Sequence, residues 1–132
     1  MSTDAWVRIP HYNFVGYNDQ GIIWSEPLGS IWVQVTSDGD EVLGVVRQAM
    51  LEAYNSTYAS FMTPEGFTGV LVRWMNSSGW DSVLLCLQEP QEGKDYSYTV
   101  DFKTKTIVVH GTNIDNRYSF KQLREGRLVY DT

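Results

Sequence analysis

The chain has a single cysteine, so an internal disulfide is excluded. Cys86 lies in an apolar run from Val83 to Leu87, where we expect a buried thiol that packs as a small hydrophobic side chain. No histidine or basic residue stands close to it in the sequence, although a catalytic thiol needs such a neighbour for activation. This use of cysteine is typical of a reducing compartment, and we expect a cytoplasmic protein.

Long hydrophobic runs are also missing. No apolar stretch approaches the ~18 residues that a membrane-spanning helix needs. Residues 1–10 lack the basic and apolar regions of a signal peptide, so we expect neither a signal peptide nor a membrane segment. With 132 residues and 42% hydrophobic side chains, the chain should form a single domain, residues 1–132, with its own core.

The motifs of common reactions are absent from the sequence. It contains no Walker or Rossmann glycine pattern, no nucleophile elbow and no cluster of metal ligands. Its histidines, His11 and His110, are far apart, and neither has a carboxylate at ligand spacing. We therefore expect no catalytic residue, no cofactor and no metal. An enzyme that uses His110 or a pair of acids such as Glu89 and Glu92 stays open as a third hypothesis.

Positive charge is scarce in the first half of the chain. Residues 1–66 contain eight acidic residues and two bases, whereas residues 67–132 contain eight of each, so the net charge of −6 arises in the first half. Such a field repels nucleic acid and anionic membranes, and it attracts basic protein surfaces. Late bases such as Lys103, Lys105 and Arg124 could touch nucleic acid, but the equal number of acids in the same half argues against this.

Several short segments have the pattern of β-strands. In Tyr96–Phe102, aromatic and aliphatic residues alternate with polar ones, and Thr106–His110 follows across a turn, as expected of a hairpin. Pro27 and Gly29 should end a short strand before a better one begins at Ser30. The expected strands are 22–24, 30–35, 80–88, 96–102, 106–110 and 118–120.

Helical spacing is clearest over residues 39–55, which predict an amphipathic helix. Ser37 with Asp40, or Asp38 with Glu41, fits the spacing of a helix cap, and these acids place negative charge at the helix start. Residues 67–75 satisfy both the helical and the strand period, so their structure stays open. Strand patterns exceed helical ones, which predicts an α+β fold: mainly an antiparallel sheet with one or two helices packed on one face.

Aromatic residues are plentiful, and they allow two interpretations. Trp24, Trp32, Trp74 and Trp80 could pack in the core of a small sheet–helix domain. They could instead stack against a ligand. A small-molecule-binding domain with an aromatic-lined pocket in the sheet is therefore an alternative hypothesis.

The order of features along residues 30–120 is similar to that of a known protein family. These features are a strand near Trp32, an acidic cap before Leu43-Gly44 and Ala49, a segment with Trp74, an aromatic-led run after Gly79, and a charged turn into Ile107-Val108-Val109. In this order the chain resembles immunity proteins of contact-dependent growth inhibition. The resemblance implies a small cytoplasmic protein, not an enzyme, that binds a toxin domain, often a basic nuclease, and blocks its active site or substrate access.

We therefore expect an immunity protein whose partner is a basic toxin domain, with neither nucleic acid nor a membrane as a partner. Negative charge would speed the encounter, and buried aromatic residues would slow dissociation. The expected contacts are the acids and nearby aromatic residues of the first half: Glu26, Asp38, Asp40, Glu41, Glu52, Trp24 and Tyr54.

Overall fold

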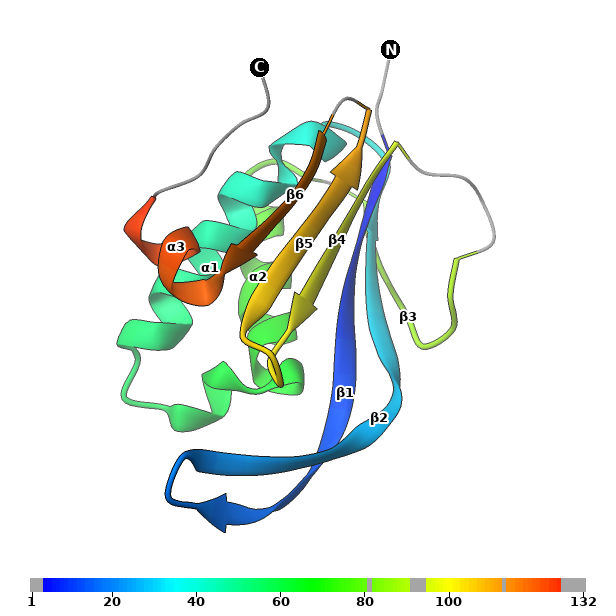
Figure 1. The fold of residues 1–132 in the computed structure, drawn as a ribbon. Helices are drawn as coiled ribbons and strands as arrows, with labels where there is room; N and C mark the ends of the chain where they lie inside the picture. Colours follow the sequence, from blue (N-terminus) through cyan, green and yellow to red (C-terminus); the bar gives the residue numbers. More distant parts are fainter. Residues whose placement is uncertain (1–3, 81, 91–94, 113, 127–132) are drawn as a thin grey trace.

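The computed structural model describes residues 4–80, 82–90, 95–112 and 114–126. These residues form one α+β domain, with a six-stranded sheet in the order β3-β2-β1-β4-β5-β6 and helices on one face of it (Figure 1). All neighbouring strands are antiparallel except β1 and β4. The expected fold class is confirmed. The strands are β1 (Ala5–Asn18), β2 (Gly21–Val35), β3 (Val83–Cys86), β4 (Tyr96–Asp101), β5 (Thr106–Gly111) and β6 (Ile114–Ser119).

Two long helices pack side by side, and short ones flank them. The 3-10 helix η1 (Gly39–Glu41) leads into α1 (Val42–Asn55), so the helix expected over 39–55 is confirmed. The ambiguous residues 67–75 belong to α2 (Pro64–Ser77). Thr63 starts α2, since its side chain accepts a hydrogen bond from the Gly66 N–H. The remaining helices are η2 (Ala59–Met62) and α3 (Phe120–Glu125).

The long β1–β2 hairpin differs from the prediction. Residues 22–24 and 30–35 lie in one strand, β2, which continues through Pro27 and Gly29. The reason is position in the sheet: β3 pairs only with residues 32–35 of β2. Pro27 lies on the part of β2 beyond that pairing, where one side of the strand is an edge among the described residues, and proline is tolerated in such edge positions.

The core lies between the sheet and α1 and α2. Alternate residues of the central strands are fully buried on this face, among them Val7, Val33 and Val100. Buried residues of α2, such as Phe67 and Leu71, recur at helical spacing and close the core from the other side.

The edge strand β3 departs from the expected burial. Cys86 is only half-buried, so the prediction of a buried thiol is wrong. Its neighbours Leu84 and Leu85 are both 58% exposed, and Leu87 is exposed as well. An apolar run gains burial only where other elements cover it, and β3 has just one neighbouring strand in the sheet.

Candidate functional site

Acidic residues that are distant in the sequence meet at one end of the sheet. Because β1 and β4 run parallel from the same end, Asp4 and Asp95 lie side by side. The Asp4 N–H donates to Oδ2 of Asp95 at 2.9 Å, and the Asp4 carbonyl accepts from Asp95 N–H at 3.0 Å. The turn between β2 and η1 returns to this end. We call Asp4, Asp38, Asp40, Glu41 and Asp95 the acidic end.

Buried aromatic side chains hold the turn of the acidic end in place. Trp80 donates from Nε1 to the Ser37 carbonyl at 2.6 Å, and the Tyr98 hydroxyl donates to the Gly39 carbonyl, also at 2.6 Å. Gly39 lies so close to β1 that an added Cβ would approach the Asp4 carbonyl oxygen to 2.9 Å. The backbone that carries Asp38, Asp40 and Glu41 is therefore fixed by the core.

The expected acids stand at the helix start, with Asp38 and Glu41 at the cap positions of η1 and α1 and with Asp40 and Glu41 in the first turn of η1, but the expected side-chain caps do not form. Neither Asp38 before η1 nor Glu41 before α1 makes a side-chain cap hydrogen bond. Asp38 has φ 53°, whereas a capping residue adopts the extended conformation that Thr63 and Ser119 show in this chain. The side chains of all three acids are exposed, and no hydrogen bond or ion pair joins their carboxylates to another side chain within the described part of the chain.

The predicted contacts Glu52 and Tyr54 lie at the other end of α1. Glu52 forms an ion pair with Arg73 and accepts a hydrogen bond from Nε1 of Trp74 at 3.2 Å. The Tyr54 ring lies 3.7 Å from the guanidinium carbon of Arg124. Both side chains therefore have partners inside the molecule.

Trp24 and Glu26, the remaining predicted contacts, lie on the far part of β2. Trp24 packs against Tyr12, with 6.4 Å between ring centroids, and Glu26 is exposed. The seven predicted residues thus occupy three separate places rather than one surface. Asp4 and Asp95 were missed, because only the pairing of β1 with β4 brings them to the acidic end.

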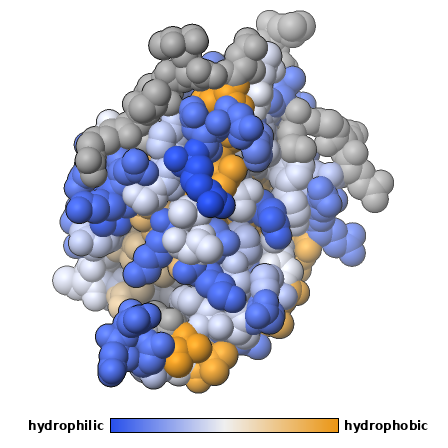
Figure 2. Space-filling view, in the orientation of Figure 1, coloured by the Kyte–Doolittle hydropathy of each residue, from blue (hydrophilic) through white to orange (hydrophobic). Residues whose placement is uncertain are grey.

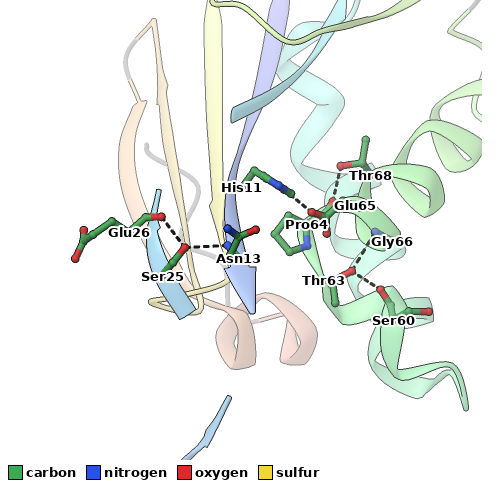
Figure 3. A network of polar contacts seen from close by, with 10 residues as sticks. All are labelled: His11, Asn13, Ser25, Glu26, Ser60, Thr63, Pro64, Glu65, Gly66 and Thr68. Carbon is green, nitrogen blue, oxygen red and sulfur yellow. Dashed lines mark hydrogen bonds and ion pairs between the residues drawn. The ribbon is translucent and has the colours of Figure 1, made fainter. Parts of the chain in front are cut away.

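Each histidine has a carboxylate neighbour in the fold, which its sequence surroundings did not indicate. His11 of β1 pairs with Glu65 in the first turn of α2 (Figure 3). His110 of β5 lies 2.9 Å from Asp115 of β6, measured from Nδ1 to Oδ1. Over the described ranges, no three His, Cys, Asp or Glu side chains come close enough to hold a metal ion.

The four tryptophans considered as a stacking site do not converge. Trp80 is buried beside the acidic end, whereas Trp74 bonds to Glu52 and Trp24 packs on Tyr12. Trp32 pairs instead with Trp6, which the sequence had not singled out.

Comparison with known proteins adds no identity. No protein family, no curated protein and no solved structure matched this chain. Among the helices of the described residues, none combines the length and apolarity that crossing a membrane requires.

Proposed function

We propose that this protein is an immunity protein that binds a basic toxin domain through its acidic end. One observation carries the proposal: Asp38, Asp40 and Glu41 project from a turn that hydrogen bonds from Trp80 and Tyr98 fix, and their carboxylates have no hydrogen-bond or ion-pair partner in the described chain. Charges held in place before binding steer a partner of opposite sign and need little reordering when it docks.

The proposed mechanism is occlusion. A nuclease binds its substrate through basic residues that contact phosphates. Carboxylates on a fixed turn can occupy the same basic groove, and they then exclude the nucleic acid from it. The role of each acid is to attract and position the toxin, so this mechanism requires no reaction by the immunity protein itself.

Growth of bacteria that express a toxin domain is the first test. The toxin to examine is a domain encoded beside the gene for this chain. Cells that express this domain alone should stop growing, and cells that also express the wild-type chain should grow. Every toxin domain encoded beside the gene should be tested. If the wild-type chain restores growth with none of them, the proposal is overturned.

Association kinetics then test the acidic end itself. Asp38→Asn with Glu41→Gln should slow association by about tenfold at low salt and flatten its dependence on ionic strength. Asp19→Asn with Glu89→Gln is the matched control, because it removes the same charge from exposed positions outside both the acidic end and the predicted contacts. Equal effects of the two double variants would remove the acidic end from the interface.

A further inference from the structure

The helix-free face of the sheet, which Figures 1 and 2 view with the helices behind it, is mostly hydrophilic. Two large aromatic side chains interrupt it. Trp6 of β1 and Trp32 of β2 are each 7% exposed although the described helices pack on the other face of the sheet. Their ring centroids are 4.2 Å apart and their planes are inclined by 58°. They form the floor of an open hollow of about 520 Å³, with Leu87 and Glu89 at its rim.

A guanidinium group is fixed beside this floor. Arg8 donates from Nε to Oγ of Ser30 at 2.9 Å, and its guanidinium carbon lies 5.8 Å from the centroid of Trp32. Arg8 is half-buried, and it forms no ion pair with any carboxylate in the described residues. Removing a cation from water without a counter-charge is unfavourable, so an anion that enters the hollow would be stabilised there.

The neighbouring strand adds hydroxyl groups to the hollow. In the parallel register of β1 and β4, Trp6 lies opposite Ser97 and Arg8 lies opposite Thr99. Both residues line the hollow. The site thus combines an aromatic floor, a fixed guanidinium and hydroxyl donors, as small-molecule sites do at volumes of roughly 300–1,000 Å³.

We propose that this hollow binds a small aromatic carboxylate, whose carboxylate contacts Arg8 and whose ring packs on Trp6 and Trp32. A guanidinium matches a carboxylate through two parallel hydrogen bonds, and indole faces pack well against a planar ring. The net charge of −6 and the nearby Glu89 favour a singly charged ligand over a nucleotide phosphate. This site is independent of the acidic end, so either proposal can fail alone.

Benzoate is the probe, with benzyl alcohol and acetate as matched compounds that lack the charge or the ring. Proton–nitrogen spectra resolve the indole N–H signals of the five tryptophans, and Trp6→Phe and Trp32→Phe assign two of them. Benzoate should shift these two signals and should bind about tenfold more tightly than either matched compound. Equal affinity for benzyl alcohol, or shifts confined to the other tryptophans, would overturn the proposal.

Charge variants supply the second test. Arg8→Gln should weaken benzoate binding by about tenfold or more. Arg117→Gln is the control, because Arg117 is exposed on the far strand β6, and it should leave binding unchanged. Glu89→Gln removes a negative charge from the rim and should tighten binding by about twofold.

If Arg8→Gln fails to fold, Arg8→Lys replaces it. This variant keeps the positive charge but loses the paired N–H donors of the guanidinium, so it should still weaken benzoate binding. Equal binding by the Arg8 and Arg117 variants, or binding of AMP without binding of benzoate, would overturn the proposal.

Discussion

The β1–β2 hairpin has two halves that share a backbone pattern and differ in burial. In the near half, residues 5–9 pair with residues 31–35 in unbroken register, and Ala5, Val7 and Ile9 are completely buried. In the far half, residues 12–18 pair with residues 21–27, the register shifts once at its start and twice within it, and Val15 is 62% exposed. Orange atoms at the lower end of Figure 2 mark apolar surface where this half curls away in Figure 1.

The two halves differ because of their neighbours and not because of their strand patterns. β4 and β3 flank the near half, and α2 covers it, whereas no described strand extends alongside the far half. Polar contacts occur at the start of the far half and within it. Figure 3 shows His11, at the junction of the two halves, reaching Glu65 of α2, and the Asn13 N–H donating to Oγ of Ser25 across the hairpin. Strand formation is therefore separable from burial in this chain.

The largest expected effect is a difference in stability between the halves when the same substitution, valine to alanine, is made in each. Val7→Ala should lower the free energy of unfolding by about 2 kcal/mol, because it leaves a cavity in a packed core. Val15→Ala should lower it by less than about 0.5 kcal/mol, because its side chain is already in water. Urea unfolding of both variants measures the difference. Similar losses would mean that the far half also contributes to the core.

Tyr12, the first residue of the far half, bonds to β4 and should make the free energy of unfolding depend on pH in the alkaline range. Its hydroxyl donates to Oδ1 of Asp101 on β4 at 2.9 Å. Burial, together with this hydrogen bond and the negative charge of Asp101, raises the pKa of Tyr12 to about 12, from 10.0. The folded protein then holds this proton more tightly than the unfolded chain does, so the stabilisation is complete below pH 10 and is lost as pH rises through 12.

The difference between wild type and Tyr12→Phe isolates that effect. The advantage of wild type over the variant should fall by about 2 kcal/mol between pH 10 and 12, since one pKa unit corresponds to about 1.4 kcal/mol. Tyr58→Phe, at a position 66% exposed, is the control and should show no such change. Parallel stability curves for wild type and Tyr12→Phe would contradict the assignment.

Sequence patterns predicted the elements whose signals are local. Helical spacing over 39–55 and the alternation in Tyr96–Phe102 need only the residues themselves, and the hairpin of β4 and β5 pairs as expected from Tyr96 to Gly111. The break expected at Pro27 did not occur, because proline is tolerated on a free edge and the sequence does not indicate which strand part is an edge.

The candidate site was predictable only in part, for the same reason. Asp38, Asp40 and Glu41 are neighbours in the chain, so they were found together. Asp4 and Asp95 join them through a pairing between strands that are 91 residues apart in sequence. The partners of Glu52 and Tyr54 likewise come from α2 and α3, which no local pattern relates to the end of α1.

The smallest expected effect concerns the contact of His11, at the start of the far half, with Glu65 of α2. Glu65→Gln removes the charge that faces His11, and both side chains are partly exposed to water, so the free energy of unfolding should fall by less than about 0.5 kcal/mol. Hydrogen exchange is the more sensitive measurement, because it reports local opening. Amides of residues 12–18 should exchange faster in this variant, while those of residues 5–9 stay protected by their neighbouring strands. Faster exchange in both ranges would mean that the two halves open as one unit. The halves would then differ in the exposure of their side chains but not in local stability.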